Sequence, residues 1–382
     1  WGMRVWIAAA ALVLPACRPY MAPPEPPPLE VARSPVRVVR VPEAPERRLS
    51  LVVRAGSAYD PASREGLAFL VAHAVASRVG ASATLDVGPE LVQLVVSPAD
   101  APRLLAALAA PLDSEALAFA RARALAQLRP ADCLSWAATI GPAWLFAGHP
   151  YGHPAPGRLS TIPTITLAEA QAFRDARWVR DAVVIAVDGA VDPAELPAFD
   201  AVFAPALSRS PTPAVRPREA RPDAVVEAPV TSACIAWGPR RAADTSVATR
   251  ALFRRAQSVL GGDLVARVDP YAFWTSPAEG DGFGAWQAWT PPTAVSPGPT
   301  PSPSSAGLAA ALLVDAVFGL PPSAAVADAA ARLGDDEVDA FVKGTLSRDN
   351  TVRLVVTPSA KTWRSAESSP TFVVLDHEAL IR

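Results

Sequence analysis

Few residues in this chain have the type and spacing that metal chemistry requires. His73 lies in residues 65–74, where most other side chains are apolar. His149 and His153 stand four residues apart, a spacing that brings two ligands together on one face of a helix. They lie instead in a Pro- and Gly-rich stretch with no Asp, Glu or Cys nearby to complete a site. We therefore expect His73 to be a buried, hydrogen-bonded histidine, and we expect no metal at His149 and His153.

Nucleophilic chemistry has no better support. The chain contains no Gly-x-Ser-x-Gly turn that would expose a catalytic serine. Cys133 has no neighbour in sequence that would activate its thiol, so we expect it in the core. The three cysteines, Cys17, Cys133 and Cys234, are too few for a disulfide framework. The sequence leaves open whether Cys133 and Cys234 form a bridge.

Length and charge bound the class of protein. The chain has 382 residues, enough for two or three domains with a sizeable core. Its net charge is −2, so the whole molecule gives no reason to expect a nucleic-acid partner.

The N-terminal residues are typical of an export signal. Met3 is the expected start, and Arg4 precedes an apolar run over residues 5–14 that is too short to span a bilayer. The run ends in Leu-Pro-Ala-Cys17, which resembles a bacterial lipobox in which Cys17 carries the lipid. The alternative is an ordinary signal peptide, residues 1–17, with an incidental cysteine. By the same resemblance, Arg18 after the cysteine favours the periplasmic face of the outer membrane.

Residues 18–48 are rich in proline and poor in apolar residues. Such a segment does not bury enough apolar surface to fold alone. We expect a polyproline-type tether between membrane and domain, with a reach on the order of 90 Å.

Residues 49–204 have the periodicity of an α+β domain. Thr166 and Glu169 form a capping-box pattern at one helix start. The expected elements are a strand over 49–56, a helix buried on most faces over 66–78, a hairpin of 81–86 and 91–97, helices over 100–112, 115–129 and 166–177, and a strand over 181–187.

A Pro- and Arg-rich run over residues 205–223 is the expected interdomain linker. A second α+β domain is expected over 224–382. Its expected elements are strands over 230–237, 285–289 and 352–356, and helices over 245–260, 307–318, 324–331 and 335–346.

The two halves repeat. Residues 166–187 align without a gap on residues 334–355, at a constant offset of 168. The identical positions are Glu169/Glu337, Ala172/Ala340, Phe173/Phe341, Arg180/Arg348, Asp181/Asp349, Val184/Val352 and Val187/Val355. The shared order of elements indicates duplication of one α+β domain, each copy an antiparallel sheet packed with helices.

Two segments of the chain resemble a known protein family. Residues 54–60 and 65–68 resemble the opening of the insulinase/pitrilysin/mitochondrial-processing-peptidase family. So does the ordered run Gly148, His149, Pro150, Tyr151 and Gly152, followed by a helix start at residue 166. The resemblance implies paired domains of like fold that form half of a peptidase chamber, and it explains His149 as a loop-shaping residue.

Active members of that family carry H-x-x-E-H on the first helix and a glutamate on a later helix. Two histidines on one helical face hold Zn²⁺, and the glutamate between them acts as general base. Carried over residue by residue, the motif falls on Phe69, Ala72 and His73, and the later glutamate falls near Ala122. Zinc is the family's cofactor, but we expect none here, because one histidine is below the ligand count of any zinc site.

The sequence therefore predicts a non-catalytic, exported lipoprotein of this family. The resemblance implies a partner subunit that joins a zinc-intact homologous peptidase and helps to enclose and bind peptides. One alternative is a free-standing envelope protein that binds peptides or scaffolds other proteins, with its lipid anchor as its contact with the membrane. A minor alternative is a divergent metalloendopeptidase with a relocated site.

Overall fold

The structure is a computed structural model of the chain. It describes residues 36–192, 196, 199–204, 221–239, 246–259, 263–265, 273–277, 305–318, 322–361 and 373–382. The expectations for the signal segment, for Cys17, and for residues 205–220 and 285–289 lie outside the described residues.

The first sheet has the strand order β1-β5-β2-β4-β3. Its strands are β1 (Arg37–Val41), β2 (Arg48–Val53), β3 (Thr84–Val87), β4 (Val92–Val96) and β5 (Val183–Asp188). β1 runs parallel to β5 and the other pairs are antiparallel, so the sheet is mixed rather than wholly antiparallel. β1 also corrects the expected tether over 18–48, because residues 37–41 are paired into the sheet instead.

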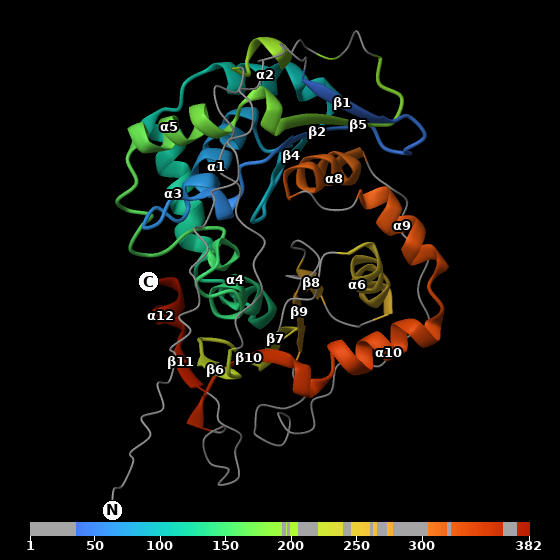
Figure 1. The fold of residues 1–382 in the computed structure, drawn as a ribbon. Coiled ribbons are helices and arrows are strands. Elements are labelled where there is room, and N and C mark those ends of the chain that lie inside the picture. The colour runs from blue at the N-terminus through green and yellow to red at the C-terminus, as the bar shows by residue number, and fades with distance from the viewer. Residues whose placement is uncertain are drawn as a thin grey trace, which may run out of the picture. The chain divides into compact units, whose positions relative to one another are not determined.

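Helix α1 (Leu67–Val79) is the most deeply buried helix of the first half (Figure 1). It packs against α2 (Ala101–Ala109), α3 (Ser114–Gln127) and α5 (Leu167–Arg177). The apolar residues on most of its faces are the physical reason, because such a helix gains free energy only where all sides are covered. The expected helix over 66–78 is thus present, shifted by one residue.

The second sheet has the order β11-β6-β10-β7-β9-β8 and is also mixed, because β6 is parallel to both β10 and β11. Its strands are β6 (Ala224–Glu227), β7 (Cys234–Pro239), β8 (Asp263–Val265), β9 (Phe273–Pro277), β10 (Thr351–Thr357) and β11 (Val373–Asp376). The helices of this half are α6 (Val247–Val259), α8 (Ser305–Phe318), α9 (Ser323–Arg332), α10 (Asp335–Thr345) and α12 (His377–Ile381). β7 begins four residues later than the expected strand over 230–237. The α+β class is confirmed.

The predicted repeat is present in the structure. α5 and α10 begin at residues 167 and 335, and the strands that follow, β5 and β10, begin at 183 and 351. Both shifts equal the sequence offset of 168. Glu169 and Glu337 have the same role in the two repeats, because each carboxylate accepts the backbone N–H of the residue that caps its helix. The donor is Thr166 at 2.7 Å in the first repeat and Gly334 at 2.9 Å in the second.

Each sheet is covered in part by a helix from the other half. α8 lies on the face of the first sheet that carries Val52 and Val184, whereas Leu51 and Val53 on the opposite face join the core around α1 (Figure 1). α4 (Cys133–Leu145), which the sequence did not predict, packs on β7 and β10 of the second sheet. The described residues from 36 onward accordingly belong to one compact unit.

Covalent and polar links join the two halves at these exchanged helices. A disulfide connects Cys133 of α4 to Cys234 of β7, with Cα atoms 5.9 Å apart, and settles the question that the sequence left open. Asp188 at the end of β5 accepts the backbone N–H of Ser305, at 2.9 Å, and so caps α8.

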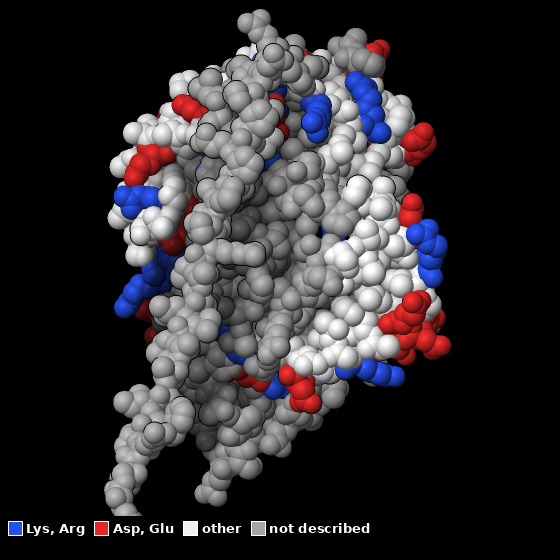
Figure 2. Space-filling model, viewed as in Figure 1, with Lys and Arg blue, Asp and Glu red and all other residues white. Residues whose placement is uncertain are grey.

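The described surface carries charges of both signs. Figure 2 shows small separate groups of acidic and basic side chains, including an acidic group over the first turn of α10. Among the described helices, none has the length and apolar character needed to cross a bilayer.

Candidate functional site

Helix α1, the element that would carry a zinc motif, begins at an unusual cap. Gly66 precedes it with a φ of 105°, and a Cβ there would lie 2.4 Å from Cδ1 of Ile162. The Asp60 carboxylate accepts the backbone N–H groups of Gly66 at 2.6 Å and Ala68 at 2.8 Å. Burial raises the pKa of Asp60 to about 8, although both N–H donors oppose that shift. The segment that resembles the family therefore fixes the start of α1.

A hollow of about 860 Å³ opens beside the second half of α1. α1 contributes His73 and Arg78, β3 contributes Thr84 and Leu85, and α3 contributes Phe119 and Arg123. β3 is the edge strand of its sheet and pairs only with β4 among the described strands. The hollow therefore lies where a helix pair meets an open sheet edge.

His73 is held in its neutral form. Its ring lies 4.1 Å from the ring of Phe69, centroid to centroid, one helical turn away. Burial lowers the pKa of His73 to about 4, and the nearby positive charge of Arg123 acts in the same direction. His73 was expected to be buried and hydrogen-bonded; its side chain is partly buried, and it forms no hydrogen bond with a described residue.

The residues around His73 do not fit a zinc ion. Phe69 and Ala72 are buried in the core and offer no donor atom. The α3 side chains that line the hollow are Glu115, Ala116, Phe119 and Arg123, and the guanidinium of Arg123 repels a cation. Among the described residues, no group of three or more His, Cys, Asp or Glu is placed to hold a metal. We therefore derive no chemistry through zinc at this site.

The position expected to match the later zinc glutamate needs correction. Ala122 is exposed and does not line the hollow. α3 buries Ala116, Ala120 and Ala124, which repeat every four residues, so Ala122 lies on the opposite side of the helix at about 100° per residue. We therefore take Phe119 and Arg123 as the α3 residues that face His73. The four-residue spacing of the buried alanines on α3 could have identified these two residues from the sequence.

The Gly148–Gly152 run forms a tight structural loop. His149 Nδ1 accepts the backbone N–H of Tyr151 at 3.2 Å, and the two rings lie edge to face with centroids 4.5 Å apart. Tyr151 is buried, and a Cβ on Gly152 would lie 2.7 Å from the Phe146 carbonyl oxygen. The next histidine, His153, places Nδ1 3.1 Å from the carbonyl oxygen of Ser57. His149 thus shapes the loop, and His153 ties it to residues 57–60.

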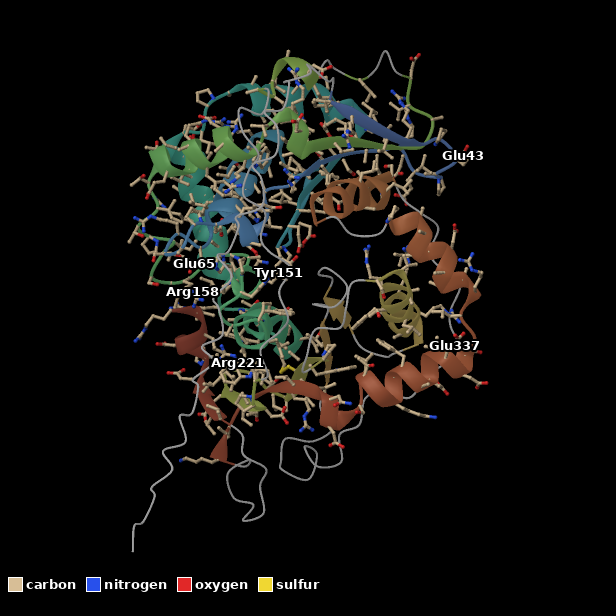
Figure 3. The ribbon with its side chains drawn as sticks, in the orientation of Figure 1. Glu43, Glu65, Tyr151, Arg158, Arg221 and Glu337 are labelled. Atoms are coloured by element: carbon tan, nitrogen blue, oxygen red, sulfur yellow. A yellow bond between two sulfur atoms is a disulfide. The ribbon has the colours of Figure 1, made fainter. Side chains whose placement is uncertain are left out.

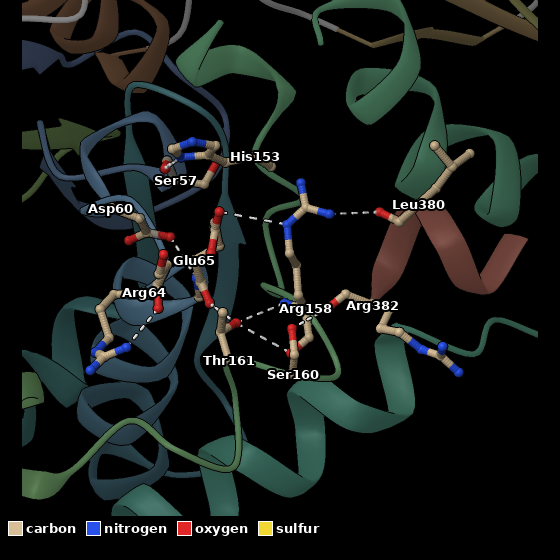
Figure 4. Close-up of polar contacts among 12 residues, drawn as sticks. Ser57, Asp60, Arg64, Glu65, His153, Arg158, Ser160, Thr161, Leu380 and Arg382 are labelled. Carbon is tan, nitrogen blue, oxygen red and sulfur yellow. Dashed lines mark hydrogen bonds and ion pairs between the residues drawn. The ribbon is translucent and has the colours of Figure 1, made fainter. Parts of the chain in front are cut away.

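A second set of contacts joins this loop region to the start of α1 (Figures 3 and 4). The Glu65 carboxylate pairs with Arg158 at 3.6 Å, and Thr161 donates its hydroxyl to the Glu65 carbonyl oxygen at 2.6 Å. Gly157, with a φ of 92°, passes so close that a Cβ would lie 2.5 Å from that same oxygen. The two family-like segments are therefore packed together as one support for α1.

The same support also receives the last residues of the chain (Figure 4). Arg158 donates to the carbonyl oxygen of Leu380 at 3.2 Å, and the Leu159 N–H donates to that of Ile381 at 2.7 Å. Contacts of residues 380–382 thus reach a loop more than two hundred positions earlier in the sequence.

Three solved structures place this fold among known proteins. A peptidase M16 inactive domain from Pseudomonas fluorescens superposes with a TM-score of 0.56 at 19% identity, over 84% of this chain and 95% of that one. A protease from Helicobacter pylori gives 0.64 at 11% identity, over 84% and 96%. Pitrilysin gives 0.51 at 14% identity, over 84% of this chain and 43% of its own. These likenesses show that the chain has the fold of M16 peptidases. No family model and no curated protein sequence matches the chain.

Proposed function

We propose that this chain is a non-catalytic member of the insulinase/pitrilysin family and the partner subunit of a zinc-intact peptidase. The fold is that of M16 peptidases, including an inactive domain. The observation that carries the proposal is helix α1 itself, where the motif positions Phe69 and Ala72 are buried without a donor atom and only His73 could offer one.

The size of the chain supports a role as one half of a larger assembly. It corresponds to 43% of pitrilysin, and it covers nearly all of the inactive domain from Pseudomonas fluorescens. In this proposal, the missing half is a separate chain that carries the intact H-x-x-E-H motif. That subunit cuts the peptide, and the present chain helps to enclose it.

Peptide binding in this proposal uses the edge of the first sheet. β3 has one paired neighbour among the described strands, so its other side offers backbone N–H and C=O groups. An extended peptide can add there as a further strand, with main-chain hydrogen bonds supplying affinity.

Export to the cell envelope completes the proposal. The Cys133–Cys234 disulfide supports it, because structural disulfides persist in oxidising compartments such as the periplasm. The N-terminal signal pattern and Cys17 support lipid anchoring at the outer membrane. Radiolabelled palmitate should enter the wild-type protein and not a Cys17→Ala variant.

Purification of the tagged, full-length protein from its own cells tests the central part. We expect it to bring down a second chain of similar size with an intact H-x-x-E-H motif. Zinc-dependent peptide cleavage should require both chains. A stable monomer with no such companion would favour the free-standing scaffold instead.

A further inference from the structure

The hollow beside α1 contains an arginine whose charge is not neutralised. Arg123 lines the hollow and forms no ion pair with a described carboxylate. The hollow has two acidic side chains, Asp113 and Glu115, and Asp113 is already paired with Arg78 at 2.5 Å. Glu115 lies eight residues before Arg123 on the same helix, a separation of about 12 Å at 1.5 Å per residue. Of the two arginines that line the hollow, Arg78 is paired and Arg123 has no ion pair with a described carboxylate.

Two other residues that line the hollow affect which ligand Arg123 could bind. Neutral His73 lies next to Arg123 and adds no positive charge of its own. Phe119, which is 49% exposed, provides an apolar wall on the same helix. The hollow thus combines a guanidinium with an apolar surface.

An extended peptide would bring side chains to this hollow. Thr84 and Leu85 of the edge strand line it together with Arg123. A strand added along β3 points every second side chain toward the helices that flank the sheet. A carboxylate there could accept two parallel N–H donations from a guanidinium.

We propose that the hollow is a specificity subsite in which Arg123 binds the Asp or Glu side chain of an extended peptide added to β3. This inference rests on the peptide-binding part of the proposed function. It assigns to that function a substrate class, acidic peptides, and a residue that selects them.

Fluorescence polarisation with three labelled octapeptides tests the subsite. Each peptide alternates Val and Thr, carries an amidated C-terminus, and differs only in a central Glu, Gln or Lys. The wild-type protein should bind the Glu peptide about threefold more tightly than the Gln peptide, as expected for one charge-assisted contact to an exposed guanidinium. Arg123→Glu should abolish that preference and favour the Lys peptide, and Arg123→Lys should retain part of it.

Arg129→Glu is the matched control, because Arg129 is exposed just beyond the end of α3 and does not line the hollow. It should leave the preference intact. Equal binding of all three peptides by the wild-type protein would overturn the subsite and leave the peptide-binding role standing. Binding of none of them would overturn both, with circular dichroism showing that each variant is folded.

Discussion

At the scale of single residues, His73 and Arg123 determine what the α1 hollow can do. A single histidine with a guanidinium nearby is a poor place for a cation, because the guanidinium repels it and no further ligand is supplied by the described residues. The same pair suits a carboxylate, because the guanidinium stays charged at all working pH values.

The titration of His73 tests this picture directly. The ring should stay neutral until the pH falls to about 4, because burial and Arg123 both disfavour the imidazolium. NMR of the four histidine rings, with His73→Gln for assignment, measures the midpoint. Arg123→Ala should raise it part of the way toward 6.5. A wild-type midpoint at or above 6.5 would contradict the assigned environment.

The same shift gives a pH dependence of stability. The pKa of His73 is lower in the folded than in the unfolded protein, so its contribution is fully present above pH 6.5 and is lost as the pH falls toward 4. The loss should be about 1–3 kcal/mol after allowance for partial exposure of the ring. It is measured as the difference in unfolding free energy between wild type and His73→Gln across that range.

Residue identity alone predicted part of the site. The lack of donors at Phe69 and Ala72 could be predicted, because the family resemblance places the zinc motif on these positions. Arg123 could not be reached in the same way. Its place in the hollow depends on the rotation of α3 against α1, which follows from the burial of Ala120 and Ala124 rather than from any motif.

At the scale of elements, the two repeats exchange helices. α4 covers the second sheet and α8 covers the first, so neither sheet is completed by its own half. Cys133 and Cys234 fix one of these exchanges covalently. The link closes a loop of about 100 residues in the unfolded chain, which reduces the entropy gained on unfolding.

Removal of this disulfide should therefore weaken the whole protein. We expect Cys133→Ala with Cys234→Ala to lower the unfolding free energy by about 2–4 kcal/mol in guanidinium titrations. A reductant should lower the midpoint of the wild-type protein by a similar amount and leave the double variant unchanged. An unaltered midpoint in the double variant would mean that the bridge does not support the exchanged packing.

The sequence predicted elements where local signals agree. The α5 capping box at Thr166 and Glu169 and the apolar run of α1 both lead to helices near the expected bounds. α4 was missed, and it contains Gly141 and Pro142, which locally disfavour a helix. β1 was missed because its proline-rich surroundings resemble a tether, and its pairing with β5 is a contact across nearly 150 residues.

At the scale of the whole molecule, the chain has the fold of M16 peptidases, and its helix α1 carries Phe69 and Ala72 buried in the core. The two segments that resemble the family, around residues 54–68 and 146–166, contact each other and support the start of α1.

Zinc content of the purified chain is the most direct test of this account. The protein should be incubated with excess Zn²⁺, passed through a desalting column and measured by mass spectrometry, with peptide cleavage assayed in parallel. We expect far less than one zinc per chain and no cleavage. Phe69→His with Ala72→Glu should not change that result, because α3 still presents Arg123. One tightly held zinc per wild-type chain, together with zinc-dependent cleavage by that chain alone, would contradict the account.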